Sequence, residues 1–295
     1  MNLFIQYLGF GLVTAAILAI GAVGFTLQYA VTNVLNLAYG AIMTIGALAA
    51  YAVNQAGVSI WLALLAGAAS SALVSVALSR AVFEPFRRRG LQLFGMVIVT
   101  IALSLVISNG LLIVAGPNPF SYNADSGRLY RFLHMVYTSE QLTVIGIAFA
   151  AMVAVRVILQ WTRLGRAMRA TAANESLARA CGINTHVVKD AAWLLSGALC
   201  GAAGVVLGLS VTAWTVSTSD GLLITIVAAA IVGGIGQPYG AILGALLLGI
   251  ATSIVGGYFN ASNTDITAFV ILVLFLVFRP TGIFSGVVKR RDVVV

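Results

Sequence analysis

The side chains of this chain that could do chemistry gather in one polar stretch, residues 161–190. Its Ala, Met, Leu and Arg content favours a helix, and Gly182 is placed to end that helix. Four arginines between Arg163 and Arg179 suit a helix resting on anionic lipid. Small and basic residues also suit a helix that docks on a cytoplasmic partner, with Arg169 and Glu175 free for polar contacts. The candidate docking residues are Gly165, Arg166, Met168, Arg169, Asn174, Glu175, Ala178 and Gly182.

Residues that could catalyse a reaction or bind a metal are scarce. His134 and His186 fall in loops on opposite predicted sides, so neither pairs with a nucleophile in a span. Cys181 and Cys200 lack the spacing of zinc ligands. The phosphate-binding pattern Gly-x-x-x-x-Gly-Lys-Ser/Thr is missing. We therefore predict no catalytic residues, no metal ligands and no cofactor bound by this chain, and we expect ATP chemistry to belong to a partner.

The composition is that of a membrane protein. Of 295 residues, 61% are hydrophobic and 8% are charged, against about 45–50% and about 25% in ordinary soluble domains. The first charged residue is Arg80. The net charge of +8 comes from basic residues in short loops, where membrane topology explains it better than nucleic-acid binding does.

Long apolar runs predict an all-α polytopic membrane bundle of about eight or nine helices, because a helix satisfies its own backbone in hydrocarbon. The seventh run is short for a crossing and suggests a half-helix or a re-entrant segment. The predicted spans are residues 5–29, 34–54, 58–82, 92–115, 140–160, 191–213, 222–236, 238–258 and 265–281. The whole chain, residues 1–295, is expected to be one transmembrane domain.

The basic residues predict which loops face the cytoplasm. Three segments, 80–89, 156–189 and 279–291, hold 14 of the 16 basic residues, and the positive-inside rule places them in the cytoplasm. We therefore expect residues 161–190 to form a cytoplasmic loop and residues 116–139 an extracytoplasmic one. Because three predicted spans precede the cytoplasmic residues 87–89, we expect the N-terminus outside.

Glycines at helical spacing predict close contact between helices. In a membrane, where lipid gives helices no hydrophobic drive to associate, small residues let backbones approach. Packing within the bundle is favoured over a dimer seam. The candidate packing residues are Gly197, Gly201, Gly204 and Gly208 in one span, and Gly236, Gly240 and Gly244 in another.

The order of several motifs resembles a known family, the LivH-type permease subunits of branched-chain amino acid importers of the ATP-binding-cassette superfamily. The strongest part is Gly-Arg-Ala-Met-Arg-Ala from Gly165, with Asn174, Ala178 and Gly182 at the family's spacing. The other motifs are residues 36–40 with 46–47, 99–102, 233–236 with 240–241 and 244, and 279–284. Two departures are Ala41, where Glu or Asp is common, and the absence of Lys from residues 221–232.

The resemblance implies that residues 165–183 are the coupling region, which fits a cleft on an ATPase subunit. It further implies a second, nonidentical permease, a periplasmic binding protein that delivers substrate, membrane lipid as solvent, and a bacterial inner-membrane location. Asn36 and Gly40 become candidates for the translocation path because they lie in the first matching motif. The substrate class is a branched-chain or related amino acid.

The alternative is a self-contained secondary carrier or channel for a small neutral or zwitterionic solute. Ion-driven carriers usually place an ionisable residue near the bilayer midplane. Here every acid is expected in a loop or near the end of a span, and this favours a permease driven by a partner.

Overall fold

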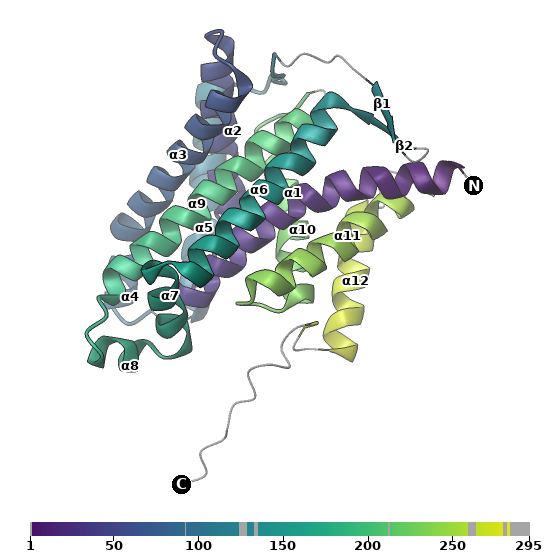
Figure 1. Ribbon diagram of the computed structural model, residues 1–295. Helices are drawn as coiled ribbons and strands as arrows, with labels where there is room; N and C mark the ends of the chain where they lie inside the picture. The colour runs from purple at the N-terminus through teal and green to yellow at the C-terminus, as the bar shows by residue number, and fades with distance from the viewer. Residues whose placement is uncertain are drawn as a thin grey trace.

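The computed structural model describes residues 2–91, 93–123, 129–132, 135–211, 213–258, 264–279 and 282–283. Within this part of the chain the fold is a bundle of tilted helices (Figure 1). The predicted all-α membrane bundle is confirmed. Most of the C-terminal basic segment, residues 279–291, lies outside the described residues.

Each predicted span corresponds to an apolar helix. In the part of the chain that the structure describes, six helices are long and apolar enough to cross a membrane. They are α1 (Asn2–Thr32), α3 (Ile60–Leu78), α5 (Leu93–Ala115), α6 (Ser139–Trp161), α9 (Thr185–Ser210) and α11 (Pro238–Tyr258), and α3 continues through the π-helical turn η1 (Ser79–Phe83) into α4 (Glu84–Arg88). The shorter membrane helices are α2 (Tyr39–Gln55), α10 (Thr218–Gly233) and α12 (Thr264–Phe278).

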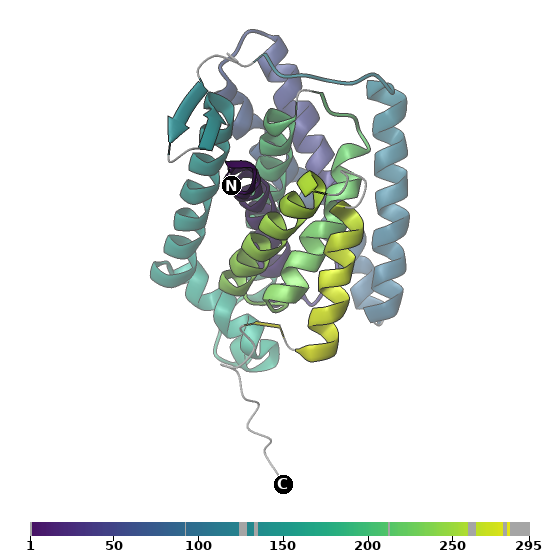
Figure 2. The same cartoon turned by 90° about the vertical axis from the view of Figure 1, so that its right-hand side faces the viewer.

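The core of the bundle lies around α1 and α9, which are mostly buried. α1 packs along α11 and α9, while α9 also packs along α3 and α2. Helix α5 is almost wholly exposed, and Figure 2 shows it (blue, at right) at the edge of the bundle. Since α1 and α9 fill the centre, they fix the position of every element that contacts them.

Two helices begin inside the bundle. After α1 ends, Asn33 adopts a left-handed backbone conformation with φ 57°, and residues 33–38 lead to α2. The Tyr39 hydroxyl donates to the Ser196 carbonyl at 3.3 Å. Ser196 lies about 16 Å from the start of α9 by helical rise. The Thr44 hydroxyl donates to the Val216 carbonyl at 3.2 Å, so the first turns of α2 and α10 lie side by side. The predicted short seventh span is α10, with 16 residues.

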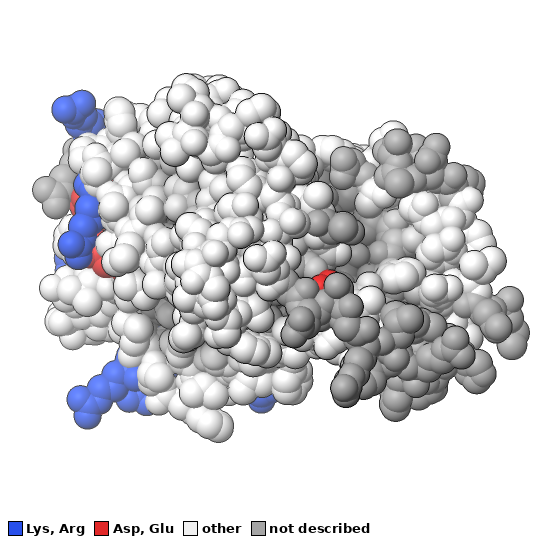
Figure 3. All heavy atoms as spheres, turned by 90° about the horizontal axis from the view of Figure 1, so that it is seen from above, with Lys and Arg blue, Asp and Glu red and all other residues white. Residues whose placement is uncertain are grey.

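Charge divides the two ends of the molecule. We call the end that carries residues 79–90 and 162–190 the basic end. Figure 3 shows one face of the molecule, on which the Lys and Arg side chains gather toward one end. The opposite end holds the antiparallel hairpin of β1 (Leu129–Phe132) and β2 (Met135–Thr138). α1 starts there too, since Tyr7 packs on Tyr258 at the end of α11. The sequence did not predict the hairpin, and residues 124–128 and 133–134 of that loop lie outside the described residues.

Candidate functional site: the docking helices at the basic end

Two short helices, α7 (Arg163–Ala173) and α8 (Glu175–Ala180), project at the basic end between α6 and α9. The Thr162 side chain caps α7 by accepting from the Gly165 N–H at 3.0 Å, and the Asn174 side chain caps α8 by accepting from the Leu177 N–H at 3.0 Å. We predicted one helix here. The chain bends at Asn174, where φ is −159° and ψ is 106°, because its amide caps the next helix instead of continuing the first.

Gly182 ends α8 as expected from its type. Its φ is 82°, a value that costs glycine nothing but strains other residues. The Gly182 N–H donates to the Arg179 carbonyl at 3.0 Å, and the Ile183 N–H donates to the Ala178 carbonyl at 3.0 Å. This pattern closes the helix and turns the chain into α9.

Three of the candidate docking residues face the bundle. A Cβ on Gly165 would collide with the carbonyls of Ile158 and Leu159 in α6. Met168 and Ala178 are 1% and 4% exposed. Gly165, Met168 and Ala178 therefore anchor α7 and α8 and are covered by the protein itself.

The outward face of α7 and α8 combines small, polar and apolar residues. Arg166 and Asn174 are exposed, and so are residues 172–173, 176 and 180–181. Leu177 is 61% exposed, unusual for a leucine on a polar helix of six residues. We call residues 172–174, 176–177 and 180–181 the docking face. Leu177 was not among the residues that the sequence predicted.

Arg169 and Glu175, expected to be free for a partner, are both engaged within the chain. The Arg169 guanidinium donates to the Leu159 carbonyl at the end of α6. Glu175 Oε1 accepts from Lys189 Nζ at 2.5 Å and from Arg179 at 2.8 Å. Lys189 lies on α9, and its side chain is only 7% exposed. These two residues thus tie the docking helices to α6 and α9.

Electrostatics favours the ionised form of Glu175. Its partial burial by itself raises the pKa of the carboxyl, but the Lys189 ammonium and the guanidinium groups of Arg87 and Arg179 outweigh that effect. The resulting pKa lies below the ordinary value of 4.5. The Glu175 carboxyl is therefore ionised at neutral pH.

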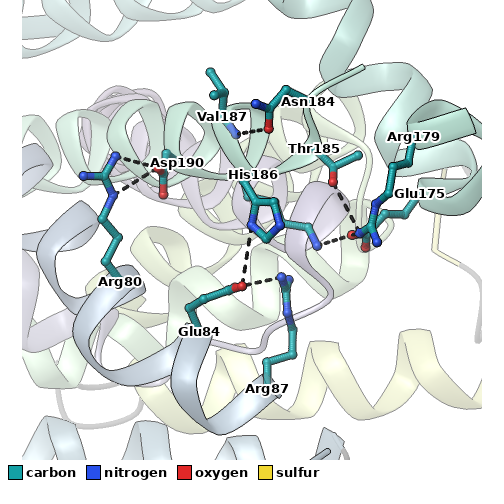
Figure 4. A network of polar contacts seen from close by, with 11 residues as sticks. Arg80, Glu84, Arg87, Glu175, Arg179, Asn184, Thr185, His186, Val187 and Asp190 are labelled. Carbon is teal, nitrogen blue, oxygen red and sulfur yellow. Dashed lines mark hydrogen bonds and ion pairs between the residues drawn. The ribbon is translucent and has the colours of Figure 1, made fainter. Parts of the chain in front are cut away.

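Further ion pairs join α9 to the end of the α3–α4 helix (Figure 4). Arg80 donates to Asp190 through two nitrogens, at 3.0 and 2.7 Å. Glu84 accepts from Arg87 at 2.7 Å and lies 3.6 Å from His186 Nδ1. A cavity of about 460 Å³ opens beside these residues. We call these contacts, together with the Glu175–Lys189 pair, the polar network. It connects the docking helices to two helices that cross the bundle.

The predicted packing glycines occupy two regions. Gly197 and Gly201 lie against α3, Gly204 lies against Met43 of α2, and Gly208 faces Tyr122 and Trp214. Gly240 and Gly244 lie against α10, near Ala229 and Gly233. Gly236 differs, because it stands in the turn between α10 and α11 with φ 86°, and a Cβ there would meet nothing closer than 3.8 Å.

The path candidates lie where α2 and α10 begin. Asn36 is fully buried, its Oδ1 accepts from the Ala38 N–H at 3.1 Å, and its Nδ2 has no hydrogen-bond partner. Gly40 contacts Asp220. We expected every acid in a loop or near the end of a span, and Asp220 lies in the first turn of α10. That turn lies against Gly40 inside the bundle, a depth that the sequence did not indicate.

Comparisons with known proteins agree with this architecture. A family model described as "Branched-chain amino acid transport system / permease component" matches residues 7–278. The chain resembles PsaBC from Streptococcus pneumoniae in complex with Fab, with a TM-score of 0.54, 17% identity, and coverage of 94% of this chain and 93% of the other. That likeness concerns the fold alone.

Curated relatives of similar length are permeases. The high-affinity branched-chain amino acid transport system permease protein LivH of Escherichia coli is 29% identical over 297 residues, and BraD of Pseudomonas aeruginosa, described in the same words, is 30% identical over 303 residues. Each comparison covers 96% of both chains. The ribose import permease protein RbsC of Escherichia coli is 29% identical over 241 residues, which cover 78% of this chain and 72% of RbsC.

Proposed function

Because the chain belongs to the family of branched-chain amino acid transport system permease components, we propose that it carries amino acids across a bacterial inner membrane within an ATP-driven importer. Its relatives are transport permeases, and the family component is a permease and not a catalytic subunit. The chain is a multi-pass membrane protein. Family membership alone does not establish the importer partners, the inner-membrane location or the substrate, which are part of the proposal.

The observation that carries the proposal is the attachment of the docking helices. A motor subunit can drive membrane helices only through a surface that it grips and that is fixed to those helices. The docking face offers an exposed apolar side chain, Leu177, among small residues, and an apolar side chain on a helix can fill a groove on a partner protein. Behind it, Glu175, Lys189 and Arg169 fix α7 and α8 to α9 and α6.

ATP hydrolysis is assigned to a separate ATPase subunit that docks on this face and binds the nucleotide. A periplasmic binding protein would deliver the amino acid to the opposite end, beside the β1–β2 hairpin. The pathway candidates, Asn36 and Gly40, lie between the two ends.

The second permease has a suitable surface along α5. That helix is almost wholly exposed, yet it carries the polar residue Asn109 on its outward face. A side-chain amide is unfavourable in contact with lipid and favourable where it can hydrogen-bond to a polar residue of another helix. We therefore assign α5 to the contact with a second permease chain.

Reconstitution tests the proposal against the alternative of a self-contained carrier. Proteoliposomes holding this permease, its second permease, the ATPase and the binding protein are expected to accumulate radiolabelled leucine when ATP is enclosed with the ATPase. Proteoliposomes holding this chain alone, under a sodium or proton gradient, are expected to accumulate none. Accumulation by the chain alone, with no gain from ATP and the other subunits, would establish a carrier and contradict the proposal.

A further inference from the structure

Asp220 lies deep within the membrane part of the bundle. It contacts Gly40 in the first turn of α2, next to Tyr39, which reaches the middle of α9. It also contacts Ser108 of α5, which lies about 22 Å from the start of that helix and about 10 Å from its end by helical rise. The carboxyl group therefore lies inside the bundle, nearer to the hairpin end than to the basic end.

The two oxygens of this carboxyl differ in their surroundings. Oδ2 accepts from the Ser108 hydroxyl at 3.0 Å. Oδ1 is buried and has no hydrogen-bond partner. It lies 2.9 Å from the position that a Cβ on Gly40 would take. Among the described residues, no Lys, Arg or His forms an ion pair with Asp220.

An unpaired carboxylate at this depth needs an explanation. Acids inside membrane spans are expensive and mark ion or substrate pathways far more often than structural contacts. A structural explanation exists, since an acid in the first turn of a helix interacts favourably with the helix dipole. That explanation accounts for the place of Asp220 in α10, but it leaves Oδ1 without a donor.

Space for a donor lies beside the carboxyl. Asp220 is partly exposed, and a Cβ on the neighbouring Gly221 would meet nothing within 4 Å. On the other side, Gly40 keeps the backbone of α2 free of a side chain where α2 faces Asp220.

We propose that Asp220, assisted by Ser108, binds the ammonium group of the transported solute within the membrane. The inference rests on the proposed function, because it assumes that a solute passes this point. It adds to that function the residue that recognises the cationic amino group, which amino acids carry and ribose lacks.

The test uses the complete importer in proteoliposomes, with ATP-driven uptake of radiolabelled leucine and ATP hydrolysis measured together. Asp220→Asn removes the charge but keeps an oxygen that can accept from Ser108. We expect leucine uptake per folded complex to fall about tenfold or more, since hydrogen bonds to charged groups are the strong ones. ATP hydrolysis should stay within about twofold, because the docking face is untouched.

Matched variants separate charge from packing. Asp220→Glu keeps the charge and is expected to retain several times more uptake than D220N. Ser108→Ala removes one donor to the carboxylate but keeps its charge, and it is expected to lose less uptake than D220N. Ser70→Ala on α3 removes a hydroxyl that only donates to the Gly67 carbonyl of its own helix, and it is expected to leave uptake unchanged.

Equal uptake by D220N and the wild type would overturn the inference and leave the proposed function standing. Equal losses in D220N and D220E would also overturn it, because they would show a packing role. A wild-type complex that transports ribose but no amino acid would contradict both the inference and the amino acid part of the proposed function. A wild-type complex without any ATP-dependent uptake would instead contradict the proposed function.

Discussion

Among single residues, Lys189 and Glu175 matter most for the attachment of the docking helices. Lys189 is nearly buried, with a side chain 7% exposed, whereas Glu175 is 38% exposed. Removing the carboxyl leaves a buried ammonium without its partner, and removing the ammonium leaves a carboxylate that still reaches Arg179 and water. The two substitutions should therefore differ in cost.

We predict that Glu175→Gln lowers the apparent Tm of the purified protein by about 2–4 °C, corresponding to about 1 kcal/mol. Lys189→Met should cost less than E175Q, because methionine fills the site without a charge. Arg179→Gln is the control, since its side chain is 62% exposed and surface pairs contribute about 0–1 kcal/mol. Thermal unfolding in one detergent at one scan rate measures all three. A larger loss in K189M than in E175Q would contradict the assignment.

The same pair predicts a pH dependence. The pKa of Glu175 is lower in the folded protein than its ordinary value of 4.5. Its contribution is therefore complete above about pH 4.5 and is lost as the pH falls through the folded pKa. The difference in apparent Tm between the wild type and E175Q should be constant from about pH 7 to about pH 5 and shrink at lower pH. A difference that grows on acidification would contradict the pair.

Several residue roles could be anticipated from the sequence, and others could not. Gly182 was predicted to end the docking helix because its residue type determines that conformation. Glu175 was expected to be free, but its partner Lys189 comes from the next helix, and only the path of the chain around Gly182 brings the two together. Asp220 was expected in a loop or near the end of a span, but its depth could not be anticipated, because hydropathy locates the apolar run and says nothing of where its helix begins.

Among the elements, α9 depends on its glycine face. Gly201 lies where a Cβ would collide with the Gly67 carbonyl and the side chain of Ser71. Backbones packed this closely cannot separate without losing contacts along both helices.

We predict that Gly201→Leu prevents α3 and α9 from packing, so that no monodisperse protein is recovered by gel filtration. Gly146→Leu on α6 is the matched control, because a Cβ there would meet nothing within 4 Å, and it should be recovered like the wild type. Recovery of G201L at the wild-type yield and Tm would show that the contact is not required.

The number and order of the membrane helices could be read from the sequence, since each buries its own backbone hydrogen bonds and shows as an apolar run. The interrupted starts of α2 and α10 could be read only in part. A short seventh span was predicted, but the pairing of Thr44 with Val216 joins segments distant in the chain. The β1–β2 hairpin was missed because four-residue strands leave a weak pattern.

For the whole molecule, the orientation in the membrane follows from charge. The two native cysteines offer a test, since Cys181 is exposed at the basic end and Cys200 is buried. In right-side-out vesicles that hold the permease without the ATPase, a membrane-impermeant maleimide should label Cys181 only after permeabilisation. Cys181→Ser, which leaves Cys200 alone, should take no label under either condition. Labelling of intact vesicles at Cys181 would reverse the orientation and contradict a cytoplasmic docking face.

The central claim is that an ATPase drives this permease by binding to the docking face. Its most direct test is purification of the tagged chain from native membranes in mild detergent, followed by mass spectrometry of the copurifying proteins. The wild type and Leu177→Met, which keeps an apolar anchor, should bring down a P-loop ATPase and a second permease. Leu177→Asp should keep the second permease and lose the ATPase at least about tenfold. Equal recovery of the ATPase with L177D, or its absence from every wild-type preparation, would contradict the account.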